Sequence, residues 1–320
     1  HEIDDDHDKL ADQMTVAHPY IMIAGPTASG KSQLAIDLAK QCGGAVINAD
    51  SMQLYADLSI LTARPQRHEM QDIPHHLFGV FDAAHRASVA EWLDHAATAI
   101  ASVRASGQLP IIIGGTGMYL QAGLRGIAPV PDVPPATHHQ CVDLYKRLGG
   151  TEFRDALAAD DPALAARLAD GDSQRLIRAM GVVLATGRPL SWWQQQPHKG
   201  AISGTAVTIA MMPSRSMLYD RINQRFDDMF AGGAIDEVRS LMARQLDPGL
   251  PLMKALGMAP LMAFLRDEIT EDDAKFIAKR DSRRYAKRQM TWIRNNFNAQ
   301  IILEKKYSES FYEKIFSLIR

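Results

Sequence analysis

The chain is poor in cysteine, in long apolar runs and in net charge, and each shortage excludes a class of protein. Its 320 residues include two cysteines, Cys42 and Cys141, which are too few for a disulfide framework or a four-ligand zinc site and fit a reducing compartment. No apolar run reaches the roughly 18 residues that a membrane-spanning helix needs. The formal net charge of −2 excludes a protein that is basic throughout, so a nucleic-acid partner would require a local basic surface. We therefore expect a cytoplasmic protein with no membrane partner.

The first residues are set apart from the rest of the chain. The segment "HEIDDDHDKLADQ" is acidic, where a signal peptide is basic and then apolar. Because the chain begins with His1, we expect Met14 to be the natural start and residues 1–13 to be a leader or a remnant of expression. The remaining length and the 46% hydrophobic content are sufficient for a substantial core with an insertion.

The strongest motif is "GPTASGKS", residues 25–32, which matches G-x(4)-G-K-[ST]. An apolar run enters it and a segment with helical spacing follows, so the context is strand, loop and helix. Backbone N–H groups in such a loop can face phosphate oxygens at the helix N-terminus, while Lys31 adds a charge and Ser32 can bind Mg²⁺. The predicted diphosphate-binding residues are Gly25, Pro26, Thr27, Ala28, Ser29, Gly30, Lys31 and Ser32.

Two further apolar segments, 44–50 and 109–115, predict buried strands with the helical stretch 88–107 between them. Alternating strands and helices indicate a parallel sheet, whose ligands gather at the carboxyl ends of the strands. We therefore predict an α/β fold, with a P-loop parallel-sheet core and helices on both faces.

A change in amino-acid composition near residue 125 predicts a second domain. A proline-rich stretch is followed by consecutive helical patterns without strand signals, and strand character returns at 204–213. The prediction is a core domain formed by 14–124 and 201–320, interrupted by an all-helical insertion domain at 125–200.

Asp50 is the aspartate that closes an apolar strand, in "AVINADSMQLY". Three roles are open for it: a general base, a magnesium carboxylate or an N-cap for the following segment. The strand at 109–115 ends in "GGTG" with no acid, and the base-reading pattern N-K-x-D of GTP-binding proteins is absent.

Two other segments offer groups for a phosphate site. In "GGTGMY" the glycines permit close backbone approach and Thr116 supplies a hydroxyl, although a tight turn alone would explain the pattern. In the predicted helix "SMLYDRINQRFDDMF", Arg221 and Arg225 lie one turn apart beside an apolar stripe. They are placed either to reach a phosphate or to remain solvated.

A local basic surface is predicted over residues 275–297. This segment contains eight cations and one acid, Asp281, with Tyr285 and Trp292 interleaved. A solvated helix face is the plain interpretation, but contact with nucleic-acid phosphates is favoured because the rest of the chain is acidic. Arg283, Arg284 and Lys287 are the predicted contacts.

Together these segments resemble the tRNA dimethylallyltransferase family, from Ile21 to about Phe297. The resemblance depends on these segments in order: "GPTASGKS", "NADSMQLYADLSILTARP", "IPHHLFGVFD", "IIIGGTGMYLQAGLRG", "DSQRLIRAMGVVLATGRPL", "YDRINQRFDDMF" and "AKRQMTWIRNNF". The glycine loop is shared with many kinases, whereas D-S-x-Q-x-Y with G-G-T-G-x-Y and K-R-Q-x-T-W is specific. Two cysteines and a chain that ends near residue 320 leave no zinc-finger tail, so we expect the bacterial type.

The resemblance implies transfer of a dimethylallyl group from dimethylallyl diphosphate to the exocyclic amine of the adenosine just 3′ of the anticodon in tRNA. The glycine loop would then bind the donor diphosphate with Mg²⁺, placed with the help of Ser32. Thr116 and Arg225 would support the diphosphate, and Asp50 would accept or orient the hydrogen of the amine. The implied tRNA-binding residues are Asp50, Ser51, Met52, Gln53, Gln174, Arg175, Leu176, Ile177, Arg178, Lys254 and Gly257. The partners would be dimethylallyl diphosphate and a tRNA anticodon stem-loop, bound by a monomer.

Some positions depart from the family pattern. The block usually written R-x-x-G-Y-[KR] runs here from Lys254 to Ala259 with Met258 in place of the tyrosine, and His138 stands where a basic arginine is expected. Two rival functions share parts of the pattern: a small-molecule or nucleoside kinase, and a nucleotide-gated RNA-binding protein without group transfer.

Overall fold

A computed structural model describes residues 18–304 and 309–319 of the chain, and the predicted leader at 1–13 lies outside them. The chain divides into two compact units. We call residues up to Leu124 and from Ile202 onward the core unit, and Arg125–Ala201 the helical unit.

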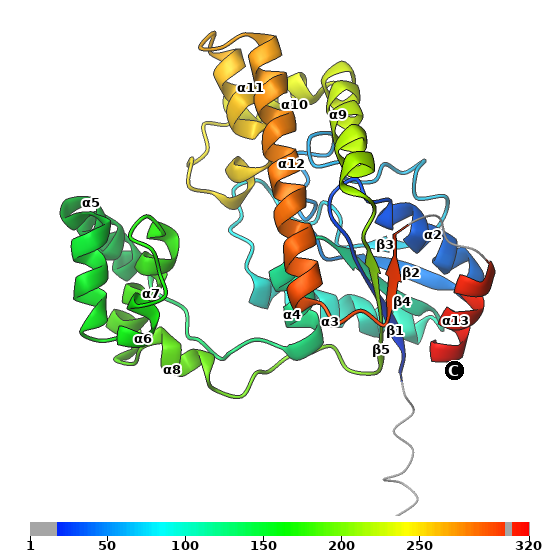
Figure 1. The fold of residues 1–320 in the computed structure, drawn as a ribbon, viewed down its shortest axis with the longest axis horizontal. Coiled ribbons are helices and arrows are strands. Elements are labelled where there is room, and N and C mark those ends of the chain that lie inside the picture. The colour runs from blue at the N-terminus through cyan, green and yellow to red at the C-terminus, as the bar shows by residue number, and fades with distance from the viewer. Residues whose placement is uncertain (1–17, 305–308, 320) are drawn as a thin grey trace, which may run out of the picture. The chain divides into compact units, whose positions relative to one another are not determined.

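The core unit is built on a six-stranded sheet in the order β3-β2-β4-β1-β5-β6, and its paired strands are all parallel (Figure 1). The strands are β1 (Tyr20–Ala24), β2 (Gly44–Asn48), β3 (His75–His76), β4 (Leu109–Gly114), β5 (Ala206–Met211) and β6 (Ile301–Leu303). The predicted fold class is confirmed. β3 and β6 were not predicted, because strands of two and three residues are too short to show a period.

Successive residues of β1 serve opposite faces of the sheet, as the two-residue period of a strand requires. Ile21 and Ile23 belong to a cluster that includes buried side chains of α2 (Lys31–Cys42) and Phe311 and Ile315 of α13 (Glu309–Ile319). On the opposite face, α3 (Val89–Ala105) packs on β2 and β4. The indole N–H of its buried Trp92 donates to the carbonyl of Asn48 at 2.7 Å. Both faces are therefore covered, which explains why the strands are continuously apolar.

A further group of core-unit helices packs on itself, with α12 against α9 and α11, and α10 against α9 and α11. They are α9 (Arg215–Ala231), α10 (Ala234–Ala243), α11 (Met258–Leu265) and α12 (Glu271–Asn296). The core unit also contains α4 (Gly117–Arg125) and the 3-10 helix η1 (Pro251–Lys254), which packs on α11. α12 begins with a capping box between Thr270 and Asp273, followed by three acids in its first turn, which favours helix initiation there. Figure 1 shows α9, α10 and α11 beyond the end of the sheet at which β1 and β5 finish, whereas α12 extends back from them to the level of α4.

The helical unit consists of α5 (Pro135–Ala158), α6 (Pro162–Ala165), α7 (Ser173–Thr186) and α8 (Leu190–Gln194). α5 is broken at Gly149, whose φ of 78° is left-handed and suits glycine. Buried Asp161 accepts from the amides of Leu164 and Ser191 at 3.1 and 3.0 Å, so one carboxylate caps α6 and holds the start of α8. No helix in the described ranges is long and apolar enough to cross a membrane.

Candidate active site

The glycine loop joins β1 to α2 and depends on two left-handed residues, Ala28 (φ 63°) and Gly30 (φ 93°). Gly30 is the N-cap of α2, so Lys31 and Ser32 occupy the first turn of the helix. A side chain at Gly25 would collide with the Ser29 hydroxyl, because a Cβ there would lie 2.6 Å from its oxygen. The sequence therefore folds into a tight loop at a helix N-terminus, where amides and the helix dipole favour an anion.

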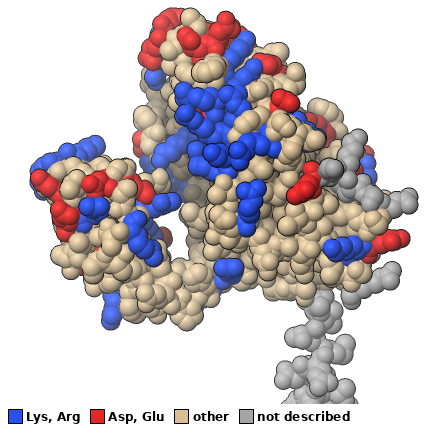
Figure 2. Space-filling view, in the orientation of Figure 1, with Lys and Arg blue, Asp and Glu red and all other residues tan. Residues whose placement is uncertain are grey.

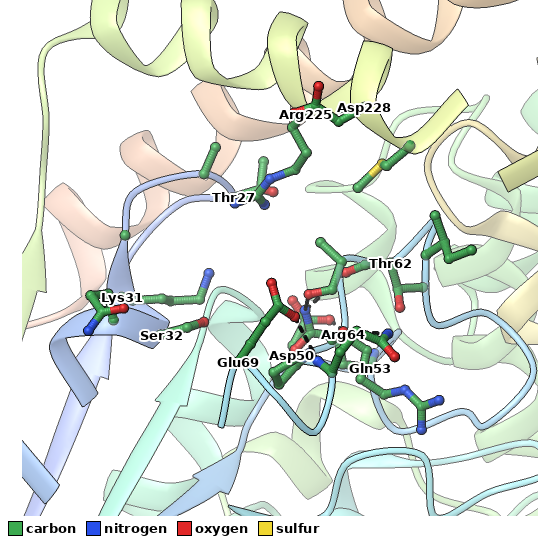
Figure 3. Close-up of a pocket in the computed structure, with 18 of the residues that line it drawn as sticks. Thr27, Lys31, Ser32, Asp50, Gln53, Thr62, Arg64, Glu69, Arg225 and Asp228 are labelled. Atoms are coloured by element: carbon green, nitrogen blue, oxygen red, sulfur yellow. Dashed lines mark hydrogen bonds between the residues drawn. The ribbon is translucent and has the colours of Figure 1, made fainter. Parts of the chain in front are cut away.

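Beside this loop lies a cavity of about 980 Å³, here called the wide cavity, lined by residues 27–32, Asp50, part of the segment 59–69, Arg221 and Arg225. Figure 3 shows Lys31 and Ser32 of α2 facing the same space as Arg225, Asp50 and Glu69. Burial lowers the pKa of Lys31 to about 8, against the opposing effect of Asp50. Burial also lowers the pKa of Arg225, against the effect of Glu69. Two partly desolvated cations would both gain from an anionic ligand.

A second, narrow cavity of about 360 Å³ adjoins the first and has more apolar walls. Leu61, Ile222 and Phe226 supply these walls, and Lys254, Tyr285 and Arg288 supply polar groups. Residues that line both cavities form their shared wall: Thr27, Asp50, Thr62, Ala63, Arg225 and Met229. A ligand in one cavity can therefore meet a ligand in the other at this wall.

Asp50 stands at the shared wall immediately beyond β2. Its Oδ1 accepts from the amide of Met52 at 3.0 Å and from that of Gln53 at 3.4 Å, while its own amide donates to the Asn48 side chain at 2.8 Å. These bonds cap a turn at residues 51–54, and no helix of the described chain begins there. This capping does not exclude the other roles, since Asp50 lines both cavities.

The implied tRNA-binding residues that follow Asp50 line different cavities. Ser51 and Met52 line the narrow cavity, whereas the side-chain amide of Gln53 donates to the carbonyls of Thr62 and Ala63 at 2.9 and 3.0 Å. Gln53 lines the wide cavity and holds the segment that forms the shared wall.

Thr116 lies behind Ser51 rather than among the lining residues of either cavity in the described chain. Its hydroxyl oxygen accepts from the Ser51 amide at 3.1 Å and is 3.4 Å from the Ser51 hydroxyl. Burial chiefly, and also Asp50, raises the pKa of Tyr285, which lines the narrow cavity. Thr116 therefore contacts the site through Ser51.

The predicted tRNA-binding stretch of α7 needs a correction. Leu176 is fully buried and Ile177 is 9% exposed in the core of the helical unit, because helical periodicity turns them inward. Their side chains cannot contact RNA in this packing. Gln174, Arg175 and Arg178 are exposed, and Arg175 pairs with Asp172 at 2.9 Å. His138 is exposed on α5.

The basic segment lies on α12, and five of its eight cations already have a polar partner. Lys275, Lys279 and Arg280 pair with Glu271, Asp227 and Asp281 at 2.5, 2.5 and 2.9 Å. Arg283 donates to the Asn223 side chain at 2.6 Å, and Arg284 lies 3.9 Å from Asp281. The exposed cations are Arg284, Lys287, Arg288 and Arg294. Figure 2 shows Lys and Arg side chains gathered over α12, so the predicted surface exists but is narrower than eight cations.

Lys254 and Gly257, the two implied tRNA-binding residues near α11, have different roles. Lys254 lines the narrow cavity. Gly257 has φ 83° and is the N-cap of α11, and a Cβ there would lie 3.0 Å from both Leu61 and Phe226. Gly257 thus permits close packing beside the narrow cavity.

Three residues that sequence reasoning missed organise this site. Glu69 lines the wide cavity. Glu237 of α10 accepts from the amides of Ser59, Ile60 and Leu61 at 2.5, 3.0 and 2.9 Å. Gln289 of α12 bonds to the glycine loop and to the "GGTG" turn. The contacts of Glu237 and Gln289 join segments far apart in the chain, so no local pattern could have revealed them.

The donor groups of the wide cavity are compatible with Mg²⁺. The described residues contain no group of three or more His, Cys, Asp or Glu side chains that could hold a metal. The Ser32 hydroxyl and the carboxylates of Asp50 and Glu69 are all hard oxygens on the wall of this cavity. Mg²⁺ is usually bound by one or two protein oxygens together with phosphate oxygens and waters, so the side chains fit a metal that arrives with a phosphate ligand.

A parallel sheet with a glycine loop after β1, and a cation-lined cavity at the same edge, defines the class of P-loop proteins, whose loop is suited to phosphate groups. The family model described as IPP transferase matches residues 53–296, and that described as isopentenyl transferase matches residues 19–77. The chain belongs to the IPP transferase family.

Curated relatives carry a consistent name. The chain is 48% identical to a tRNA dimethylallyltransferase of Hyphomonas neptunium over 281 residues, which cover 88% of this chain and 89% of the relative. It is 50% identical to a tRNA dimethylallyltransferase of Rhodopseudomonas palustris, with 86% of each chain covered.

Solved structures agree with the fold. A tRNA isopentenylpyrophosphate transferase from Bacillus halodurans superposes with a TM-score of 0.66 at 32% identity, covering 94% of this chain and 95% of the other. A eukaryotic dimethylallyltransferase acting on tRNA superposes with a TM-score of 0.73 at 27% identity, covering 87% and 70%.

Proposed function

We propose that this protein transfers the dimethylallyl group of dimethylallyl diphosphate to the exocyclic amine of an adenosine next to the anticodon in tRNA. The bond between the allylic carbon and the diphosphate oxygen breaks, and a bond from that carbon to the amine nitrogen forms. Diphosphate leaves, and one proton leaves the nitrogen. Family membership supports the class of reaction, and the shared wall between the two cavities is the observation that carries the assignment of substrates to sites.

The wide cavity is the site of the donor diphosphate. The glycine loop amides, Lys31 and Arg225 surround a space large enough for this group. Because burial disfavours the charged forms of Lys31 and Arg225, an entering diphosphate restores their preference for the proton. Their charges then oppose the negative charge that grows on the departing diphosphate, which lowers the barrier to cleavage of the C–O bond. Thr116 bonds to Ser51, which lines the narrow cavity, so its support reaches the acceptor side of the site.

Mg²⁺, held by Ser32 and the diphosphate oxygens, would add Lewis-acid charge at the leaving group. Ser32 is suited to this role because it lies in the first turn of α2 beside Lys31.

The narrow cavity receives the adenine base. Leu61, Ile222 and Phe226 offer apolar contact, and Ser51 and Met52 line the side next to Asp50. A base in an anticodon loop is stacked, so it must be turned out to enter a pocket of this kind. Lys254 and Arg288 line the same cavity and are placed to contact phosphates that flank the base.

Asp50 acts as the general base at the shared wall. The exocyclic amine of adenine is a weak nucleophile, because its lone pair is delocalised into the ring. A carboxylate that accepts a hydrogen bond from the amine stabilises the positive charge that develops on nitrogen as the new bond forms. Hydrogen bonds from the amides of Met52 and Gln53 to Oδ1 hold the carboxylate in one orientation, and help of this kind is worth about 10² to 10⁴ in rate.

Transfer RNA binds through phosphate contacts outside the cavities. The exposed cations Arg284, Lys287 and Arg294 of α12 contribute from the core unit. Gln174, Arg175 and Arg178 of α7 contribute from the helical unit. Such contacts give affinity and register, while the pocket selects the base. A monomer in the cytoplasm fits this description.

The direct test supplies purified protein with dimethylallyl diphosphate, Mg²⁺ and unmodified tRNA, and analyses the digested nucleosides by mass spectrometry. We expect an adenosine that carries one added five-carbon unit, with release of diphosphate. A parallel reaction with ATP in place of the donor tests the kinase alternative, and phosphate transfer from ATP with no prenylated adenosine would refute the proposal.

A further inference from the structure

We propose that Gln289 is a positioning residue, which ties the glycine loop to the "GGTG" turn and thereby sets where the donor diphosphate lies relative to the narrow cavity. This inference rests on the proposed function. It assigns a role to a side chain that enters neither cavity.

The hydrogen bonds of Gln289 are the first observation. Gln289 is 5% exposed, its Oε1 accepts from the Thr27 amide at 2.9 Å, and its Nε2 donates to the carbonyl of Gly115 at 3.0 Å. Thr27 belongs to the shared wall of the two cavities. One amide group thus uses an acceptor on the loop and a donor on the turn, and orients the peptide before Thr27 in the process.

The glycines of the turn give the second observation. A Cβ at Gly115 would collide with Nε2 of Gln289, and a Cβ at Gly117 would collide with the ring of Trp292. Gln289 and Trp292 are three residues apart, so they lie on one side of α12. The absence of side chains at Gly115 and Gly117 allows α12 to approach the turn closely.

The third observation is that the same side of α12 continues toward the reaction centre. Tyr285, one turn before Gln289, lines the narrow cavity. Arg284 and Lys287 on the same helix are exposed. α12 therefore carries the proposed tRNA contacts on its outer surface, and its inner surface contacts the glycine loop and the "GGTG" turn.

The physical consequence concerns alignment rather than charge. Without the Gln289 amide, the buried N–H of Thr27 and the carbonyl of Gly115 lose their partners, which favours rearrangement of the loop. A displacement of about 1 Å in a bound reactant can lower a rate by about 10². A change at Gln289 should therefore affect the donor constants and leave tRNA binding intact.

The test replaces Gln289 with Met, which keeps length and burial but lacks both hydrogen bonds. We expect kcat/KM for dimethylallyl diphosphate to fall by about 10 to 100 times, while KM for tRNA changes less than about twofold. Gln300→Met is the matched control, because Gln300 also accepts from a backbone amide, that of Thr208 at 3.0 Å, at the β5–β6 side of the sheet. Constants for Gln289→Met equal to those of the control would overturn the inference.

Two further variants separate positioning from loss of folding. Gln289→Glu restores the same donor and acceptor pattern only when its carboxyl group is protonated, so its activity relative to wild type should recover as the pH falls. Charged or titratable groups near it are Lys31, Asp50, Arg225, Tyr285 and Arg288, which line the adjoining cavities. Gly115→Ala should displace the amide from the other side and reproduce the donor defect. If the activity of Gln289→Glu relative to wild type does not change with pH, the positioning role of Gln289 is contradicted.

Binding of inorganic diphosphate, measured by calorimetry, keeps this inference separate from the proposed function. Wild type that forms no prenylated adenosine would refute the proposed function. If Gln289→Met binds diphosphate as tightly as wild type and its donor KM and kcat are unchanged, the positioning role of Gln289 is refuted and the proposed function is not affected.

Discussion

The two cavities of the core unit share a wall and differ in what completes them. Lys31, Arg221 and the loop amides complete the wide cavity, whereas Leu61, Ile222 and Phe226 line the narrow one. Under the proposed function, this difference separates the two substrates by polarity. A cationic space suits a diphosphate, and a less polar one suits a neutral base.

Charge at the shared wall is the link between the cavities. Asp50 and Arg225 both line each of them, and their opposite charges suit opposite tasks. Arg225 can stabilise a leaving anion, and Asp50 can accept a hydrogen from an amine that becomes positive. Changes at this wall should therefore affect chemistry most, and changes farther out should affect binding.

The largest effect is expected for Asp50→Asn, which keeps the size and removes the charge. The rate should fall by at least about 10², with diphosphate affinity changed less than about threefold. Single-turnover rates across a magnesium titration provide the measurement. Recovery of the rate at high magnesium would show instead that Asp50 is a metal ligand.

Glu237→Gln tests whether Glu237 holds in place the segment that leads into the shared wall of the two cavities. The carboxylate accepts from the amides of residues 59–61, which precede Thr62 and Ala63 of the shared wall. We expect a loss of about 1 to 3 kcal/mol in the free energy of unfolding, with faster hydrogen exchange in this segment. Asp236→Asn is the control, because Asp236 is exposed and pairs with Arg239 at the surface, and it should cost less than about 1 kcal/mol. If both variants lost the same free energy of unfolding, Glu237 would have no special role in holding this segment.

Lys31 gives the wide cavity a pH dependence. With its pKa lowered to about 8, Lys31 loses its proton as the pH rises through that value, whereas bound diphosphate raises the pKa again. Diphosphate affinity should therefore be full below about pH 8 and fall by up to about tenfold per pH unit above it. Calorimetry in buffers of different ionisation enthalpy should detect proton uptake on binding near pH 8. Lys31→Arg keeps its charge and should bind with a flatter profile, and an equally steep profile would rule out Lys31 as the source.

The smallest effect is expected on the outer surface of α12. Neutralising exposed Arg284 and Lys287 should lower the salt dependence of tRNA binding by about 1.4 to 1.8 in slope, roughly 0.7 to 0.9 per phosphate contact. The turnover rate at saturating tRNA should not change. Lys275 and Lys279, which pair with acids, supply the control pair. If the control pair lowered the slope as much, the difference between paired and exposed cations would be wrong.

The sequence predicted the parts of the site that lie at strand ends. The glycine loop and Asp50 follow apolar runs, and Thr116 follows another, so a parallel sheet brings them to one edge. The contacts of Gln289 and Glu237 could not be predicted, because they join segments more than 170 residues apart. The burial of Leu176 and Ile177 shows the reverse limit, since a motif identifies a segment without distinguishing its inner side from its outer one.

The most direct test of the whole account is a crystal structure with both substrates in place. The protein would be crystallised with a dimethylallyl diphosphate analogue, whose bridging oxygen is replaced by sulfur to slow the reaction, and an unmodified anticodon stem-loop. The account predicts the diphosphate in the wide cavity on the glycine loop, an adenine in the narrow cavity, and its exocyclic nitrogen within hydrogen-bond distance of the Asp50 carboxylate. An adenine bound in the wide cavity, or Asp50 turned away from the amine, would contradict it.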